Sequence, residues 1–252
     1  MRVDNEAAYV LHRREYRDTS LLVELYTRHY GRICGVAKGA RRQRSALGQA
    51  LNLFQPLVAG WTGRGDLVTI THAEMNGEAC LLQGDRIYYG LYINELLMKF
   101  LVRHDPHEAL YDAYEVTLSR LAAGEDDWAL RKFEKHLLSA IGYGVVLDHD
   151  VVHHMPLKSD RTYIYMADLG PVPFDGERIP EEPAGIKISG AALCALKDEI
   201  RVDQNVRREV KRLMRFLINR HLEGRVLQTR RLWRSVSRDP GLVPSATENK
   251  ND

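Results

Sequence analysis

The sequence predicts an α+β protein in which a five-stranded barrel is followed by a mainly helical domain. Three observations support this class. The first 80 residues hold short apolar stretches with a period of two, and after Gln83 the apolar period changes to that of a helix. A strongly basic stretch then covers residues 206–238. With 252 residues and 44% hydrophobic content, the chain is long enough to bury a substantial core.

Five segments near the amino end are expected to form strands. They are residues 7–13, 20–27, 31–37, 55–61 and 67–73. Residues 38–51, which have room for a short helix, separate the third and fourth strands, and the glycines of residues 60–66 indicate a hairpin turn. Five short strands suggest a small barrel, for which the oligonucleotide-binding (OB) fold is the commonest five-stranded choice. An SH3-like barrel is the alternative.

Helices are expected in most of the remaining chain. Apolar residues at helical spacing predict them over residues 87–101, 110–121, 130–141 and 189–200. Asp203 and Thr229 have side chains suited to cap two further helices, the first of them basic. Residues 145–186 are rich in proline and charge, so we expect an irregular insert there with one short strand at residues 163–166.

The amino end and the cysteines indicate a cytoplasmic protein. The first six residues hold two acids where a secretion signal needs a basic segment, and no apolar run is long enough to span a bilayer. The cysteines Cys34, Cys80 and Cys194 are odd in number, far apart and without a C-x-x-C pair, which is typical of thiols that only fill a core in a reducing compartment. No membrane association is expected.

The charge of the chain is strongly polarised. Residues 206–238 contain eleven Lys or Arg and two acids, whereas the rest contains 25 basic and 32 acidic residues. On a helix, Val206, Val210, Leu213 and Leu217 share one face. The opposite face would carry Arg207, Arg208, Lys211, Arg212 and Arg215. Like charges four residues apart cost about 0.2–0.5 kcal/mol per pair, so an anion must compensate. Nucleic-acid phosphates and the acids of residues 81–205 are the two alternatives.

A second basic cluster follows directly after the third predicted strand. Lys38, Arg41, Arg42 and Arg44 fall within seven residues, together with Gly39. Arginine forks match phosphate oxygens, and a glycine allows backbone N–H groups to approach the same anion. The loop is therefore a candidate phosphate site, with a merely solvated loop as the alternative.

The chain shows little sign of catalytic equipment. It lacks the G-x-x-x-x-G-K-[ST], G-x-G-x-x-G and G-x-S-x-G motifs. Asp148, His149, Asp150, His153 and His154 form the one cluster resembling a metal site, and a metal-dependent hydrolase built on it is the weakest of our hypotheses. The sequence predicts binding without turnover, with no catalytic residue, metal or cofactor.

Several segments together carry a resemblance to a known family. They are Tyr9-Val10-Leu11-His12, Thr19-Ser20-Leu21, Val36-Ala37-Lys38-Gly39-Ala40-Arg41, Gln55-Pro56-Leu57, Gly90-Leu91-Tyr92-Ile93-Asn94-Glu95-Leu96-Leu97, and Leu130-Arg131-Lys132-Phe133-Glu134 leading into Gly142-Tyr143-Gly144. In this order they resemble RecO, the bacterial recombination mediator family, over residues 7–236. The resemblance implies an amino-terminal OB barrel on a helical carboxy-terminal domain.

The resemblance also implies function and partners. Members of the family bind single- and double-stranded DNA, anneal complementary strands, and work with RecR to load RecA onto DNA coated by single-strand-binding protein. Their helical domain holds a groove for the acidic, hydrophobic tail of that coating protein. By this resemblance Arg131 would pair with the tail carboxylates, and Lys132 or Lys135 would assist.

One departure from the family concerns zinc. Many relatives carry four cysteines after the Gly-Tyr-Gly segment, whereas this chain has Asp150 and His153 at the first pair of positions and no candidate ligands at the second. We therefore expect no zinc, and an insert that packing alone must hold.

The leading hypothesis is a non-enzymatic, nucleoid-associated DNA-binding mediator. Residues 1–80 would be its OB-fold DNA-binding domain, residues 81–238 its helical domain with the insert, and residues 239–252 a disordered tail. Its DNA contacts would be Lys38, Arg41, Arg42, Arg44 and the basic face Arg207, Arg208, Lys211, Arg212 and Arg215. The alternative is a protein–protein adaptor that docks the tail of the single-strand-binding protein and has little direct role on DNA.

Overall fold

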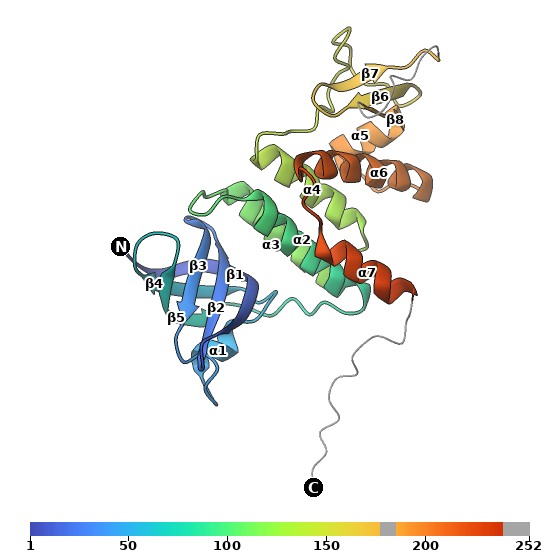
Figure 1. The fold of residues 1–252 in the computed structure, drawn as a ribbon. Helices are drawn as coiled ribbons and strands as arrows, with labels where there is room; N and C mark the ends of the chain where they lie inside the picture. Colours follow the sequence, from blue (N-terminus) through green and yellow to red (C-terminus); the bar gives the residue numbers. More distant parts are fainter. Residues whose placement is uncertain (177–184, 239–252) are drawn as a thin grey trace.

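The protein is elongated, with a barrel at one end and a small sheet at the other (Figure 1). The computed structural model describes residues 1–176 and 185–238. Helices stand between the barrel and the small sheet, so the α+β class and the order of barrel then helices predicted from sequence are confirmed. The predicted tail, residues 239–252, lies outside the described residues.

The amino-terminal barrel has OB topology. Its strands are β1 (Arg2–Tyr16), β2 (Ser20–Thr27), β3 (Gly31–Ala37), β4 (Leu57–Thr62) and β5 (Val68–Met75), and α1 (Ala46–Ala50) lies between β3 and β4. The closed order is β1-β2-β3-β5-β4, with β3 and β5 parallel and all other pairs antiparallel. Alternating residues of these strands, among them Val10, Val23 and Ile33, fill the interior.

Six helices form most of the remaining part that the structure describes. They are α2 (Asp85–Phe100), α3 (Glu108–Ala122), α4 (Trp128–Ala140), α5 (Gly190–Asp198), α6 (Gln204–His221) and α7 (Gln228–Arg238). Ser189 caps α5 by accepting from the Ala192 N–H at 3.2 Å, close to the predicted start of a helix at residue 189. The predicted cap of the last helix is wrong, because α7 begins at Gln228 and Thr229 lies inside it.

The insert is more regular than expected. Its described part contains β6 (Thr162–Met166), β7 (Gly170–Pro173) and β8 (Gly185–Ser189), which form an antiparallel sheet in the order β7-β6-β8. The sequence indicated β6 alone, so the expectation of an otherwise irregular insert is corrected. Tyr163, Tyr165 and Ile188 of this sheet are buried against α5 and α6, which gives the insert an apolar core.

Barrel and helices are joined by a buried aromatic cluster and a set of polar contacts. Tyr9 and Tyr26 of the barrel pack on Tyr111 and Tyr114 of α3, with ring centroids 5.2–5.8 Å apart. The buried amide of Asn94 donates to the Leu11 carbonyl at 3.0 Å. Since these contacts are buried on both sides, the two parts are held in one orientation.

None of the helices within residues 1–176 and 185–238 has the length and apolar content that crossing a bilayer requires.

Candidate nucleic-acid interface

The basic helix predicted from sequence is α6. Asp203 caps it by accepting from the N–H groups of Asn205 and Val206 at 2.7 and 3.1 Å. Its buried side chains are Val210, Leu213, Met214, Leu217 and Ile218, which pack on the rest of the helical domain. The apolar stripe fixes the rotation of the helix, so the cations are turned away from the core.

The five predicted cations of α6 fall into two groups. Arg207 forms an ion pair with Asp126, and Lys211 forms one with Asp127 at 2.7 Å. Burial is the largest influence on Asp126 and opposes its ionisation. The contacts with Arg207, the Trp128 N–H and Arg201 together outweigh burial and lower the pKa of this carboxyl. The expectation that the chain's own acids neutralise this face is therefore correct for two of the five.

The other three α6 cations have no carboxylate partner within the described residues. Arg212 donates to the carbonyl of Lys187, whereas Arg208 and Arg215 are exposed and make no hydrogen bond or ion pair there. These three side chains leave a net positive strip along α6. A phosphate chain could bind this strip without displacing an internal carboxylate.

The barrel loop shows a similar division. Arg41 pairs with Glu15 at 2.9 Å, while Lys38, Arg42 and Arg44 are exposed and have no carboxylate partner in the part of the chain that the structure describes. Gly39 has φ +70°, a conformation that glycine adopts without steric cost, and this bends the loop directly after β3. Three unpaired cations therefore project from one short turn.

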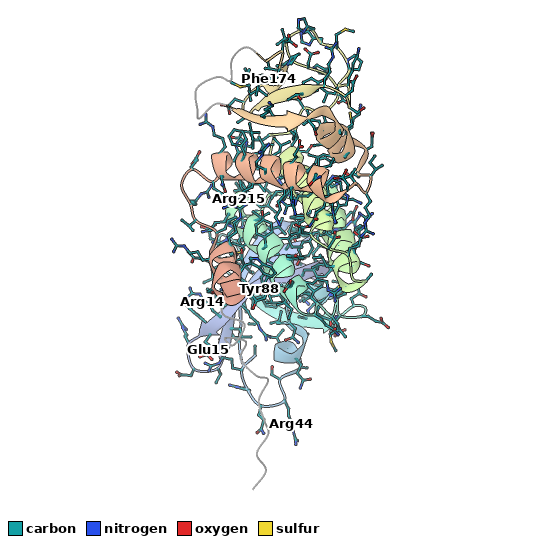
Figure 2. All side chains as sticks on the ribbon, turned by 90° about the vertical axis from the view of Figure 1, so that its right-hand side faces the viewer. Arg14, Glu15, Arg44, Tyr88, Phe174 and Arg215 are labelled. Atoms are coloured by element: carbon teal, nitrogen blue, oxygen red, sulfur yellow. The ribbon has the colours of Figure 1, made fainter. Side chains whose placement is uncertain are left out.

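The barrel contributes further cations that the sequence reasoning missed. Arg14 and Arg17 are exposed at the end of the β1–β2 hairpin, close in sequence to Glu15, which holds Arg41. Figure 2 shows Arg14 and Arg44 on the barrel, with Arg215 farther along the same molecule on α6. The signal was present, since several basic residues cluster in residues 12–17. Residues 14–19 lie between the first two predicted strands, and the sequence alone assigned them no role.

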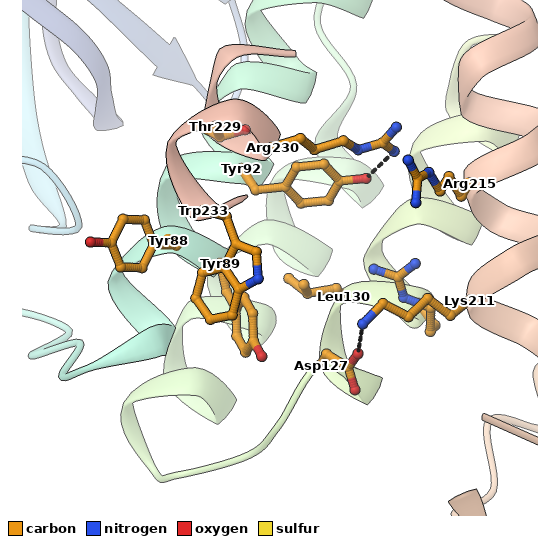
Figure 3. A pocket seen from close by; sticks show the side chains of 11 residues that line it. Tyr88, Tyr89, Tyr92, Asp127, Leu130, Lys211, Arg215, Thr229, Arg230 and Trp233 are labelled. Carbon is orange, nitrogen blue, oxygen red and sulfur yellow. Dashed lines mark hydrogen bonds and ion pairs between the residues drawn. The ribbon is translucent and has the colours of Figure 1, made fainter. Parts of the chain in front are cut away.

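A pocket of about 280 Å³ opens between α2, α4, α6 and α7 (Figure 3). One wall is aromatic, because the Trp233 ring lies 5.2 Å from Tyr88 and 5.7 Å from Tyr89. The other wall is basic. The lining residues are Tyr88, Tyr89, Tyr92, Asp127, Leu130, Arg131, Lys211, Arg215, Thr229, Arg230 and Trp233. An apolar wall facing cations suits a ligand with an aromatic group and negative charge.

A buried network holds two of the pocket's arginines. The carboxylate of Glu134, which is fully buried, accepts from Tyr92 Oη at 2.6 Å and pairs with Arg131 at 2.9 Å. Arg230 in turn donates to Tyr92 Oη at 3.2 Å. Burial raises the pKa of Glu134, while Arg131 and the Tyr92 hydroxyl oppose that rise. Arg131, only 7% exposed, is thus anchored rather than mobile.

The amino end of helix α7, which closes the pocket, is held by a carboxylate on α2. Glu95 accepts from the N–H groups of Gln228 and Thr229 at 2.7 and 2.9 Å, and from the Thr229 hydroxyl at 2.6 Å. A carboxylate at a helix amino end also complements the helix dipole. Glu95 therefore takes the capping role that the sequence analysis assigned to Thr229.

Comparison with known proteins decides the family. A family model described as the amino-terminal domain of recombination protein O matches residues 1–77, and its carboxy-terminal counterpart matches residues 81–231. The chain belongs to the RecO family. It is 45% identical over 237 residues to a DNA repair protein RecO of Methylococcus capsulatus, with 94% of this chain and 95% of that relative covered. A DNA repair protein RecO of Coxiella burnetii is 41% identical over 231 residues, covering 92% and 98%.

The remaining predicted tail-binding residues of this RecO-family protein lie away from Arg131. Lys132 lines a separate hollow of about 300 Å³, together with Asp126, Trp128 and Arg201. Lys135 pairs with Glu199 at 2.5 Å and donates to carbonyl groups near the end of α5. Of the three, the structure brings only Arg131 into the aromatic pocket. Its neighbours there come from residues 88 to 233, a combination that no local pattern in the RecO-like sequence reveals.

Two acids of the RecO-like insert have structural roles. Asp150 accepts from the N–H groups of Val152, His153 and Met155 at 2.6–3.2 Å and so organises the turn. Asp148 pairs instead with Lys197 at 2.8 Å. Within residues 1–176 and 185–238, no group of three or more His, Cys, Asp or Glu is arranged to hold a metal.

Proposed function

We propose that this chain is a non-enzymatic DNA-binding recombination mediator. It would anneal complementary strands and, with RecR, help load RecA onto DNA coated by single-strand-binding protein. The observation that carries this proposal is the pair of cationic surfaces whose side chains have no carboxylate partner among the described residues. They are Lys38, Arg42 and Arg44 on the barrel, and Arg208, Arg212 and Arg215 on α6.

Two surfaces on one stiff body suit annealing. Each cation that meets a phosphate releases condensed counterions, which favours binding with little dependence on base sequence. Strands held on the barrel and on α6 would have their mutual repulsion screened. Residues 1–80 would then act as the DNA-binding barrel, and residues 81–238 as the helical domain that adds the second surface. The protein would work in the cytoplasm, associated with the nucleoid.

The aromatic pocket supports the predicted partner. An acidic tail that ends in an aromatic residue would place its ring against Tyr88 and Trp233 and its carboxylates near Arg131 and Arg215. Lys132 and Lys135 lie outside this pocket, so they would contribute only to the positive electrostatic field that attracts the acidic tail. We propose the pocket as the docking site for the tail of single-strand-binding protein.

Strand annealing on coated DNA tests the proposal. Complementary strands coated with intact single-strand-binding protein should anneal faster when the protein is added, and deletion of the coating protein's tail should reduce this gain. The triple variant K38A/R42A/R44A should lose most of its annealing activity, both on DNA coated with the intact single-strand-binding protein and on DNA coated with the tail-deleted form. R41A is the matched control, because Arg41 is already paired with Glu15, and it should lose little.

A protein–protein adaptor remains the second candidate. The internal ion pairs of Arg207 and Lys211 favour it, since they neutralise part of the basic face. Under this alternative the triple barrel variant would anneal coated strands as well as the unaltered protein, and only pocket variants would show a loss.

A further inference from the structure

Two of the five cations on the basic face of α6 also line the aromatic pocket. Lys211 and Arg215 lie one turn apart on α6 and both line the pocket, whereas Arg208 and Arg212 do not (Figure 3). The pocket and the outer basic surface of α6 are therefore adjacent sites with shared charges. A ligand bound to one must alter the field at the other.

The internal contacts single out Arg215. Among the pocket cations, Arg131 is bound to Glu134 and Arg230 donates to Tyr92 and Asn219. Lys211 is bound to Asp127. Arg215 is the pocket cation for which the described residues supply neither a carboxylate nor a hydrogen-bond acceptor. An acidic ligand in the pocket gains most from this side chain, and so does a phosphate on α6.

We propose that an acidic tail in the pocket and DNA on α6 compete for Arg215, so that binding of either ligand weakens binding of the other. This inference rests on the proposed function, because it assigns regulation to the same pocket. A guanidinium directed at a tail carboxylate is withdrawn from the phosphate chain. In addition, two anions on neighbouring parts of one helix repel each other within a Debye length of about 8–10 Å.

The barrel cations lie outside this competition. Lys38, Arg42 and Arg44 do not line the pocket. They belong to the barrel, which lies at the end of the molecule opposite the small sheet (Figure 1), and Figure 2 shows Arg44 there. A tail-bound protein would thus hold DNA through the barrel alone. Release of the tail would open the α6 surface to a strand. Docking on the coating protein and engagement of DNA at α6 would then follow one another.

Reciprocal affinity measurements test the competition. The full chain is titrated with a fluorescent acidic peptide that ends in phenylalanine, with and without saturating oligothymidylate of about 30 nucleotides, roughly twice the largest site of one OB fold. DNA should weaken peptide binding about tenfold, and saturating peptide should weaken DNA binding at α6 by the same factor, since coupling between two sites is reciprocal. The DNA titration is made in K38A/R42A/R44A, so that it reports α6.

Three variants of α6 identify the shared residue. R215A should reduce the coupling to about twofold or less, and R215K should retain much of it. R208A is the matched control, because Arg208 is exposed on nearly the same stripe, about 10 Å along the helix, and outside the pocket. It should weaken DNA binding and leave the coupling at about tenfold.

Two results would overturn the inference. One is an unchanged peptide affinity in saturating DNA although both ligands bind, and the other is equal loss of coupling in R208A and R215A. Failure of the proposed function looks different, because the peptide or the DNA would then not bind even when offered alone.

Discussion

Arg131 is predicted to stabilise the fold as well as the pocket. The perturbation is R131M, which removes the charge and keeps most of the side-chain stem. It would leave the Glu134 carboxylate, which is fully buried, with the Tyr92 hydroxyl as the only remaining donor in the network. Removing one partner of a buried ion pair costs about 3–5 kcal/mol. For a chain of this size, Tm falls by about 2–4 °C for each kcal/mol of lost stability, so we expect the Tm of R131M to fall by roughly 6–20 °C.

The pH dependence gives a second test of the same network. Burial raises the pKa of Glu134, and Arg131 opposes the rise, so R131M should raise this pKa further. A carboxyl whose folded pKa is raised contributes stability below its unfolded pKa, and that contribution is lost as pH increases through the folded pKa. The loss of Tm in R131M, relative to the unaltered protein, should therefore be smaller at pH 5 than at pH 8.

Thermal unfolding by calorimetry at these two pH values measures both effects. The double variant R131M/E134Q keeps an acceptor for Tyr92 without the buried charge, and it should recover most of the lost Tm. A Tm for R131M within 2 °C of the unaltered protein at pH 8, or a deficit that grows on acidification, would refute the reasoning.

Three further predictions concern α7, the insert turn and the aromatic wall. E95A removes the acceptor at the start of α7, so hydrogen exchange of the α7 amides should become about fivefold faster, corresponding to about 1 kcal/mol for a lost cap, while α3 amides stay unchanged. The N–H of His153, with those of Val152 and Met155, lowers the pKa of Asp150. The amides of this turn should therefore lose protection from hydrogen exchange as pH falls through that lowered pKa. In D150N the protection factors should not respond to pH, and a response equal to that of the unaltered protein would contradict the assignment. W233A should weaken the acidic, phenylalanine-terminated peptide about tenfold and leave DNA affinity within twofold, and an unaltered peptide affinity would exclude the aromatic wall as its site.

The barrel and most helices could be predicted because their signals are local. A period of two identified the strands, and glycines placed the turn between β4 and β5, where Gly63 has φ +129° and Gly65 has φ +81°. Strands β7 and β8 were missed for a physical reason. The segment Gly170–Pro173 contains two prolines, and both strands are short, so only pairing with β6 on either side makes them strands.

The candidate site was predictable only in part. The charge count predicted that the basic face of α6 needs anions. It could not predict which of these cations the chain's own acids neutralise, because that depends on how the loop before α4 places Asp126 and Asp127. The pocket was not predictable from spacing, because Tyr88 and Trp233 meet only after α7 packs on α2. Arg131 was indicated by resemblance alone, and its burial beside Glu134 came from the structure.

The salt dependence of DNA affinity tests the central claim most directly. Six cations without a carboxylate partner in the described residues, Lys38, Arg42, Arg44, Arg208, Arg212 and Arg215, predict that log K for single-stranded DNA falls by about 4 for each decade of salt. K38A/R42A/R44A should reduce this slope by about 2, and R41A should change it by far less than one. A slope near zero, or one that the triple variant leaves unchanged, would show that these cations do not bind the phosphate chain.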